Sequence, residues 1–206
     1  IAMNYFELFL LLFVCSSIPA TSSVSYVCQL KLELGEVNVA NQGSCDSNGM
    51  PIELCIPASW PYISCDANNN VRGIHLSEAQ LVGPVPTSIG GITTLTHLDM
   101  SYNQLAGNIP SSFASLTLLQ DLKLNGNSLL GSIPSFLGSL TSLQRIHLQN
   151  NFFSGSVPAS FSSLYQLSDL RLYNNSGVTA NISALCSLSN LTTFYLATQE
   201  HECPLP

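Results

Sequence analysis

The sequence predicts an α/β solenoid in which short parallel strands are stacked at intervals of 24 residues. Three sets of residues carry this prediction, because each set recurs with the same spacing along the chain. They are Pro86, Pro110, Pro134 and Pro158; Gly83, Gly107, Gly131 and Gly155; and Leu76, Met100, Leu124, Leu148, Leu172 and Leu196. A fixed period of about 20 to 50 residues is typical of repeat architectures, since one coil cannot bury its own apolar face.

Each repeat contains a short segment in which apolar and polar residues alternate, such as Leu98-x-Met100. A period of two predicts a strand with one buried face. Such segments occur at 74–76, 98–100, 122–124, 146–148, 170–172 and 194–196. Their regular return predicts six parallel strands, spaced about 4.8 Å apart.

The other recurring residues indicate how each coil turns. The asparagine after each strand can satisfy backbone groups inside the turn and bridge neighbouring coils. The glycine allows a backbone conformation that other residues resist. The proline ends strand pairing and starts the return, which we expect to be a loop or 3₁₀ helix. The asparagines are Asn103, Asn127, Asn151 and Asn175, and the residues expected to fill the core behind the strands are Ile89, Phe113, Leu137 and Phe161.

One unit, residues 95–118, reads LTHLDMSYNQLAGNIPSSFASLTL. It resembles the plant-type leucine-rich repeat, whose pattern is LxxLxLxxNxLxGxIPxxLxxLxx, and the resemblance extends over residues 71–198. It implies a leucine-rich repeat solenoid of about five to six 24-residue repeats with a concave parallel β-sheet. It also implies an extracellular protein, similar to receptor-like kinase ectodomains or polygalacturonase-inhibiting proteins.

Residues 1–23 are predicted to be a secretory signal peptide. The apolar core from Leu8 to Val14 is too short to span a bilayer, which needs about 20 apolar residues. Small residues follow, and Ala20 is the expected cleavage point. The absence of Lys and Arg before this core and the presence of Glu7 favour the alternative, a buried core helix. Cleavage would leave six cysteines, and an even number suits an oxidising compartment.

The cysteines avoid residues 66–185, which predicts two disulfide-bonded caps, at 24–70 and at the chain end, 199–206. The segment CIPASWPYISC, with Trp60 between two cysteines, resembles the N-terminal cap of plant leucine-rich repeat proteins. Four cysteines there allow three pairings. The expected pairs are Cys55 with Cys65, Cys28 with Cys45, and Cys186 with Cys203. A zinc site is the alternative, but the spacings of 17, 10 and 10 do not match a C-x2-C knuckle.

The composition limits the function classes. Charged residues make up 8% of the chain, with 5 Lys and Arg against 12 Asp and Glu, so we expect no nucleic-acid binding. Three sequons, at Asn174, Asn181 and Asn190, are predicted to carry glycans, which would keep such a charge-poor secreted chain soluble.

The exposed strand positions are expected to form three columns on the concave face. The first two contain every charged residue between 79 and 198. In one interpretation these charges only pair across strands, as Asp99 with Lys123, Asp121 with Arg145, and Arg145 with Asp169, each pair contributing about 0.2–1 kcal/mol. The columns are His75, Asp99, Lys123, His147, Arg171 and Tyr195; Gly73, His97, Asp121, Arg145, Asp169 and Thr193; and Ser77, Ser101, Asn125, Gln149, Tyr173 and Ala197.

In the second interpretation the concave sheet is a rigid ligand platform, with Arg171, Tyr173 and Tyr195 as anchors. The resemblance supports this interpretation. The candidate ligand-binding residues are His75, His97, Asp99, Asp121, Lys123, Arg145, His147, Asp169, Arg171, Tyr173 and Tyr195.

No catalytic motif stands out, so we expect no enzyme, no cofactor and no metal site. His75 and His97 are diagonal neighbours about 7–8 Å apart, which is long for shared metal ligation. Asp99 and Asp121 could imitate a glycosidase pair, but their cationic neighbours would keep both ionised.

The function we expect is a secreted or cell-surface recognition module without a membrane span. It would bind a protein, peptide or oligosaccharide, with a receptor kinase as a further partner. The alternatives are an inhibitor of a cell-wall-degrading enzyme and a structural wall protein.

Overall fold

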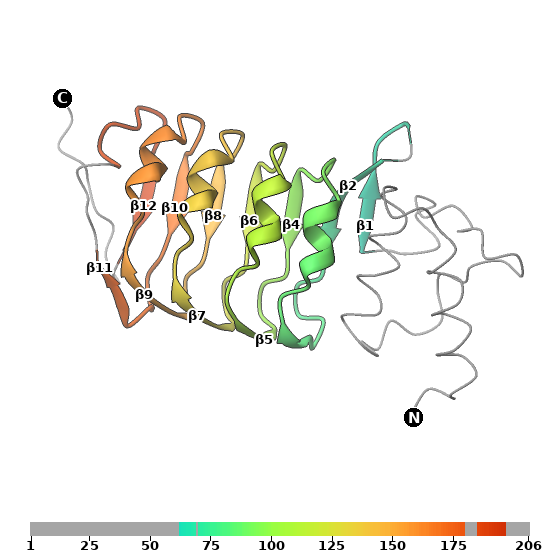
Figure 1. The fold of residues 1–206 in the computed structure, drawn as a ribbon, viewed down its shortest axis with the longest axis horizontal. Coiled ribbons are helices and arrows are strands. Elements are labelled where there is room, and N and C mark those ends of the chain that lie inside the picture. The colour runs from blue at the N-terminus through green and yellow to red at the C-terminus, as the bar shows by residue number, and fades with distance from the viewer. Residues whose placement is uncertain (1–61, 69, 180–184, 197–206) are drawn as a thin grey trace, which may run out of the picture.

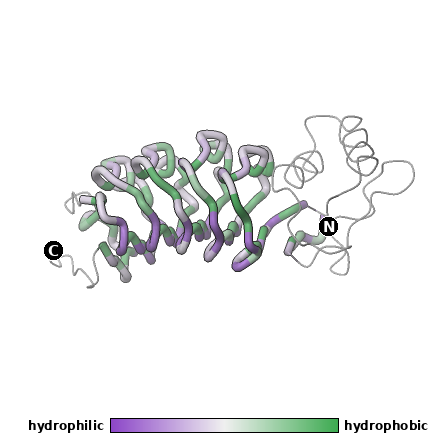
Figure 2. The backbone as a smooth tube through the Cα atoms, turned by 90° about the horizontal axis from the view of Figure 1, so that it is seen from below, coloured by the Kyte–Doolittle hydropathy of each residue, from purple (hydrophilic) through white to green (hydrophobic). Residues whose placement is uncertain are grey.

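The computed structural model of the chain describes residues 62–68, 70–179 and 185–196. These residues form a solenoid whose coils are stacked along one long axis (Figure 1). Figure 2, turned by 90°, shows that successive coils lie side by side and repeat a similar order of hydrophobic and hydrophilic residues. The expected signal peptide, most of the N-terminal cap and the chain end lie outside the described residues.

One face of the solenoid is a seven-stranded sheet with the order β1-β2-β4-β6-β8-β10-β12. All neighbours from β2 to β12 are parallel, and their register repeats every 24 residues, as in His97↔Asp121. The six expected parallel strands are therefore confirmed, and the observed strands end one residue before the expected ranges. The strands are β1 (Ile63–Cys65), β2 (Val71–His75), β4 (His97–Asp99), β6 (Asp121–Lys123), β8 (Arg145–His147), β10 (Asp169–Arg171) and β12 (Thr193–Tyr195).

Strand β1 pairs with β2 in the antiparallel direction, which the repeat pattern did not predict. It covers the N-terminal edge of the parallel strands, where β2 would otherwise present unpaired backbone groups. His75 donates its backbone N–H to the Tyr62 carbonyl at 2.7 Å, which continues this pairing.

A second sheet, also absent from the sequence expectations, follows the turn of each coil. It has the order β11-β9-β7-β5-β3, and all of its pairs are parallel. The four repeat glycines predicted from the sequence adopt positive φ, for example +83° at Gly107 and +82° at Gly131, which confirms the expected role of this position. The strands are β3 (Val82–Pro84), β5 (Gln104–Gly107), β7 (Ser128–Ser132), β9 (Phe152–Ser156) and β11 (Gly177–Thr179).

The returns are short 3₁₀ helices, as expected. Each begins directly after a proline of the repeat, and that proline is extended, with φ between −61° and −68°. Behind the strands, Ile89, Phe113, Leu137 and Phe161 are all 0% exposed and join one continuous core. The helices are η1 (Thr87–Gly91), η2 (Ser111–Ser115), η3 (Ser135–Ser139) and η4 (Ala159–Ser163).

All neighbouring 3₁₀ helices contact each other, but the pairs η1–η2 and η3–η4 share a closer contact through a serine. Ser112 in η2 donates its hydroxyl to the Thr87 carbonyl in η1, at 2.8 Å, and its backbone approaches Gly90 so closely that a Cβ there would lie 2.4 Å from the Ser112 carbonyl oxygen. The same two contacts join η4 to η3, through Ser160 and Gly138. Between the pairs, Phe136 of η3 occupies the position of these serines and has no hydroxyl.

The repeated asparagines bind the coils together. Asn127 is buried, accepts a hydrogen bond from the Leu105 N–H at 3.0 Å, and donates to the carbonyls of Met100 and Leu124, both at 3.0 Å. One side chain thus satisfies groups of its own coil and of the preceding one. The same pattern recurs at Asn103, Asn151 and Asn175, which confirms the role expected of this column.

Candidate ligand-binding face

Two adjacent columns of polar side chains cross the seven-stranded sheet, because each strand places equivalent residues in register with its neighbours. The structure therefore brings the two charged columns together as expected. The described charges of these columns are three aspartates and three cations, so their formal charges cancel. They are Asp99, Asp121, Asp169, Lys123, Arg145 and Arg171.

Asp121 is the most enclosed of these groups, since the residue is only 5% exposed. One carboxylate oxygen, Oδ2, accepts a hydrogen bond from Arg145 and lies 3.3 Å from His97 Nε2. The hydrogen bond from Arg145 to Asp121 raises the pKa of that guanidinium, against an opposite effect of burial. The other oxygen, Oδ1, has no hydrogen-bond partner in the described part of the chain. The expected pairing of Asp121 with Arg145 is confirmed, but its burial was not expected.

Asp169 is held from both sides by cationic or polar groups. His147 Nε2 lies 2.8 Å from Asp169 Oδ2, and Arg171 donates from Nε and Nη2 at 3.0 and 2.8 Å. Burial raises the pKa of Asp169, but the hydrogen bonds with His147 and Arg171 outweigh it and leave the pKa below its usual value. The expected contact of Asp169 with Arg145 is therefore replaced by contacts with His147 and Arg171.

Asp99 and Lys123 form a looser pair, as expected, with 3.6 Å between carboxylate oxygen and ammonium nitrogen. Asp99 also accepts hydrogen bonds from the backbone and the hydroxyl of Ser101. At the N-terminal end, the exposed His75 lies within 3.2 Å of the Ser64 hydroxyl on β1. Each of these contacts links two strands or stabilises the end of one.

The third column corrects the sequence expectation. Ser101, Asn125 and Gln149 were expected to be exposed, but each is only 4% exposed. These residues follow the strand, where the chain turns inward toward the asparagine column, so their side chains lie beneath the surface. The Gln149 side-chain oxygen has no hydrogen-bond partner among the residues that the structure describes. Of this column, only Ser77 at the N-terminal end and Tyr173 at the C-terminal end remain accessible within the described residues.

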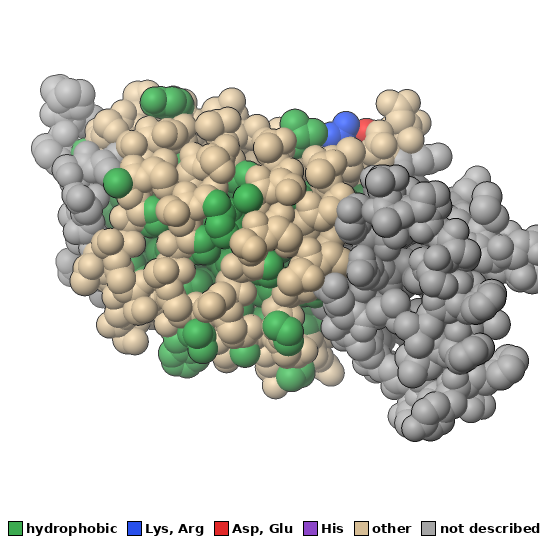
Figure 3. Space-filling view, in the orientation of Figure 1, with side chains coloured by type: hydrophobic (Ala, Val, Ile, Leu, Met, Phe, Trp, Pro, Cys, Tyr) green, Lys and Arg blue, Asp and Glu red, His purple; other side chains and the backbone are tan. Residues whose placement is uncertain are grey.

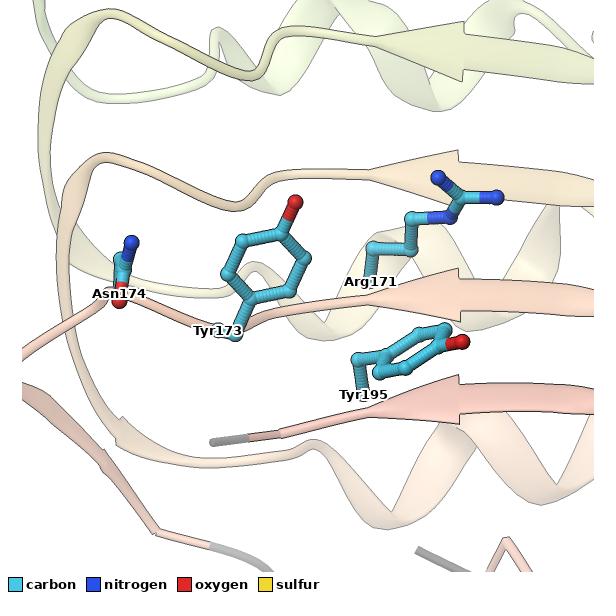
Figure 4. Close-up of a pocket in the computed structure, with 4 residues that line it drawn as sticks. All are labelled: Arg171, Tyr173, Asn174 and Tyr195. Atoms are coloured by element: carbon cyan, nitrogen blue, oxygen red, sulfur yellow. The ribbon is translucent and has the colours of Figure 1, made fainter. Parts of the chain in front are cut away.

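A shallow pocket lies at the C-terminal end of the face, lined by Arg171, Tyr173, Asn174 and Tyr195 (Figure 4). The rings of Tyr173 and Tyr195 meet edge to face, with centroids 6.2 Å apart and an interplanar angle of 75°. The Arg171 guanidinium carbon lies 5.9 Å from the centre of the Tyr195 ring. The three anchors proposed from the sequence are thus neighbours, and Asn174 joins them, although the sequence suggested it only as a sequon.

The opposite side of the solenoid is poor in charge. On the face turned to the viewer in Figure 3, Lys, Arg, Asp and Glu colours appear only near the N-terminal end of the described coils. The remaining surface is built from uncharged polar and hydrophobic residues. The charged residues between 79 and 196 therefore all lie on strands of the seven-stranded sheet, whereas Arg72 and Glu78 lie outside the two columns.

Other expected sites are only partly described. Asn174 and Asn190 are exposed, while Asn181 lies outside the described residues. Cys65 and Cys186 are disulfide-bonded, and their pairing stays a prediction because Cys55 and Cys203 lie outside the described residues. The pairing of Cys28 with Cys45 lies outside them too.

Two statements about metal sites and membrane spans apply to residues 62–68, 70–179 and 185–196. Among them, His, Cys, Asp and Glu form no group of three or more that could hold a metal ion. None of the helices in these ranges has the length and apolar character needed to cross a bilayer.

Comparison with known proteins agrees with this architecture. The family profile described as Leucine Rich Repeat matches residues 94–116, 118–140 and 142–164. Among curated protein sequences, none matches significantly.

Solved structures give the more extensive similarity. The BIR2 ectodomain from Arabidopsis thaliana is 26% identical, with a TM-score of 0.63, covering 78% of this chain and 96% of that chain. A chain of the BIR3–SERK2 complex from Arabidopsis thaliana is 26% identical, with a TM-score of 0.64, covering 89% and 97%. A chain of the Arabidopsis receptor kinase HAESA complex with the peptide hormone IDA and the co-receptor SERK1 is 27% identical, with a TM-score of 0.69, covering 85% and 30%.

The chain thus spans nearly all of the BIR2 ectodomain, but less than a third of the matched chain in the HAESA complex. The repeat motif, the register of its strands and these similarities agree with one another. The chain therefore contains leucine-rich repeats, and its fold is similar to that of plant receptor kinase ectodomains.

Proposed function

We propose that this chain is a secreted or cell-surface recognition module, whose strand face binds a peptide or protein ligand. The observation that carries the proposal is the confinement of charge: every charged residue between 79 and 198 lies in two adjacent columns of one sheet. The coils are held together chiefly by a continuous hydrophobic core and by bridging asparagines, and neither of these requires the charged columns.

The geometry of the columns suits an extended ligand. The side chains are fixed on strands, which hold binding groups more rigidly than loops do. In one column opposite charges alternate from β6 to β10, as Asp121, Arg145 and Asp169, so a ligand with a matching pattern would be held in one register. The similar structures support this choice, since one holds a peptide hormone with its co-receptor and another is a complex of two ectodomain proteins, BIR3 and SERK2.

A binding screen followed by site-directed variants tests the proposal. The full chain would be immobilised and probed by surface plasmon resonance with purified receptor kinase ectodomains and synthetic secreted peptides. For any binder, we expect the triple variant Lys123→Gln, Arg171→Gln, Tyr173→Ala to weaken the affinity by about 100-fold, because such residues supply a large share of interface energy. Arg145 is kept, since its loss would leave the buried Asp121 without its strongest partner.

The matched control changes exposed residues on the return side, as Thr117→Ala, Leu118→Ala and Tyr165→Ala. This control is expected to bind like the wild type. A strand-face variant with unchanged affinity, together with a control that loses binding, would show that the ligand uses another surface.

A further inference from the structure

The pocket at the C-terminal end of the strand face differs chemically from the charged columns beside it. We propose that this pocket holds a neutral sugar ring. The pocket shares Arg171 and Tyr173 with the face proposed above to bind a peptide or protein, but the sugar proposal rests on its own observations and is tested with separate ligands. The argument follows from the aromatic rings, the free hydrogen-bonding groups, the local charge and the position of Asn174.

Two tyrosine rings supply the apolar contact. Tyr173 follows β10 and Tyr195 lies on β12, so their rings meet at one corner of the sheet, with centroids 6.2 Å apart (Figure 4). Both residues are half-buried, which holds the rings in place while leaving part of each accessible. The face of an aromatic ring carries negative partial charge and attracts the polarised C–H groups along one side of a pyranose ring.

The polar groups of the pocket match sugar hydroxyls, which both donate and accept hydrogen bonds. Arg171 uses Nε and Nη2 to bind Asp169, so Nη1 keeps its two N–H groups for another partner. The hydroxyls of Tyr173 and Tyr195 have no hydrogen bond to another residue among those that the structure describes. The Asn174 side chain adds an amide oxygen at the rim.

The charge of the pocket favours a neutral ligand over an acidic one. The single cation that lines it, Arg171, is already paired with Asp169 through two of its nitrogens. An anion would have to compete with this carboxylate, which lies 2.8 Å from the guanidinium. A neutral hydroxyl can instead bind the free edge of Arg171 without breaking the pair.

Asn174 provides one source for such a ring. It opens the sequon Asn174-Asn175-Ser176, it is exposed, and it lines the pocket itself. Its amide nitrogen donates to the Asn150 side-chain oxygen at 2.8 Å. Glycosylation replaces one of two amide hydrogens, so this bond can persist while the first sugar begins at the pocket wall. The second source is a free oligosaccharide from outside the chain.

Asn190 is the internal comparison. It is also an exposed sequon asparagine, but its amide nitrogen donates to the Tyr165 carbonyl at 2.7 Å on the return side. Tyr165 is 68% exposed and does not line the pocket. A glycan on Asn190 therefore has no aromatic pair to pack against.

The first arm of the test asks whether the chain's own glycan fills the pocket. The full chain would be secreted from a eukaryotic host with high-mannose glycans, trimmed to single N-acetylglucosamine residues, and mapped by mass spectrometry. Ser176→Ala removes the Asn174 glycan and keeps the asparagine. We expect this variant to melt about 2–4 °C lower than the wild type. The difference should disappear in a Tyr173→Ala background, whereas Asn190→Gln should not shift the melting temperature.

The second arm asks whether the pocket binds a free sugar. The Ser176→Ala protein would be titrated with N,N′-diacetylchitobiose, cellobiose and digalacturonate, with tyrosine NMR shifts as the readout. We expect a saturable response to at least one neutral disaccharide, at least 10-fold weaker binding of digalacturonate, loss with Tyr173→Ala and no change with Tyr165→Ala.

The outcomes distinguish the two sources. A melting shift alone assigns the pocket to the glycan on Asn174, and a neutral-sugar response alone assigns it to a free oligosaccharide. Preferential binding of digalacturonate would overturn the proposal in favour of an anion site. The absence of both a melting shift and a sugar response would overturn the proposal. Peptide or protein binding is measured separately and would be unaffected by that failure.

Discussion

Three aspartates on one sheet differ in burial and in their ion pairs, so they are expected to contribute differently to stability. Asp99 pairs loosely with Lys123 at 3.6 Å, whereas Asp121 is 5% exposed and Asp169 is held by both His147 and Arg171. An exposed pair contributes about 0.2–1 kcal/mol, but a buried carboxylate that loses its partner is strongly destabilising. The charged columns therefore contain both structural pairs and pairs that a ligand can disturb at little cost.

Asp169 makes the stability of the protein depend on pH. Its pKa is lowered in the folded state, so its contribution is complete above the unfolded value of about 3.9 and is lost as the pH falls through the folded pKa. Between about pH 5 and pH 2.5, we expect the melting temperature of the wild type to fall further than that of Asp169→Asn. Scanning calorimetry across this range measures the difference, with the exposed Glu78→Gln as control. Parallel curves for wild type and Asp169→Asn would contradict the expectation.

The sequence located the charged columns but not the burial of their members. Strict alternation places Asp99, Asp121 and Asp169 on the outer face, and this was confirmed. Alternation says nothing about which side chains lie across each carboxylate, because Arg145 and His147 could each lean toward either neighbouring strand. For the same reason Asn174 was recognised as a sequon but not as part of a pocket.

Among the structural elements, the asparagine column joins neighbouring coils through repeated side-chain hydrogen bonds. Asn127 bridges two coils with bonds to Leu105, Met100 and Leu124, all of them buried. We expect Asn127→Ala to lower the free energy of unfolding by at least about 2 kcal/mol, since each buried group left unpaired costs about 1–3 kcal/mol. Urea denaturation measures this loss.

The control for that substitution is Asn108→Ala, because Asn108 is exposed and lies outside the column. Its effect should stay within about 0.5 kcal/mol. Equal losses for the two variants would mean that the column does not bridge the coils in solution.

The second sheet is the element that the sequence pattern did not predict. Its strands are short, and segments such as Phe152–Ser156 mix a glycine with serines, which are composition signals of turns rather than strands. Pairing there depends on the coils already being stacked by the first sheet. The first sheet, the returns and the core could be predicted from a single repeat, whereas the second sheet needed several coils in place.

At the scale of the whole molecule, each coil contacts mainly its two neighbours, so stability should spread along the chain over a limited distance. One backbone N–H in each coil donates to a carbonyl of the next coil at 2.7–2.9 Å, so its hydrogen exchange measures the local stability of that contact. These amides belong to Met100, Leu124, Leu148 and Leu172. We expect Leu122→Ala, which empties a fully buried position on β6, to lower hydrogen-exchange protection most at Met100 and Leu124, whose hydrogen bonds join the substituted coil to its two neighbours.

Protection at Leu172, two coils from the substitution, should fall less. The surface substitution Leu118→Ala, at a 44% exposed position, is the control and should leave all of these amides protected. A uniform loss from Met100 to Leu172 would indicate that the solenoid unfolds as a single cooperative unit.

The serine contacts between 3₁₀ helices recur every two coils, so the return side has a period twice as long as that of the strands. Gly90 and Gly138, which accept the close approach of Ser112 and Ser160, are 48 residues apart, and the position between them is Ala114. Duplicating only the coil that contains η3 would place a second copy of Phe136 against Gly138, at the position that Ser160 now occupies. Inserting a block of two coils preserves the existing contacts between neighbouring 3₁₀ helices. Lengthening of this protein by tandem gene duplication, or by design, should therefore add coils two at a time.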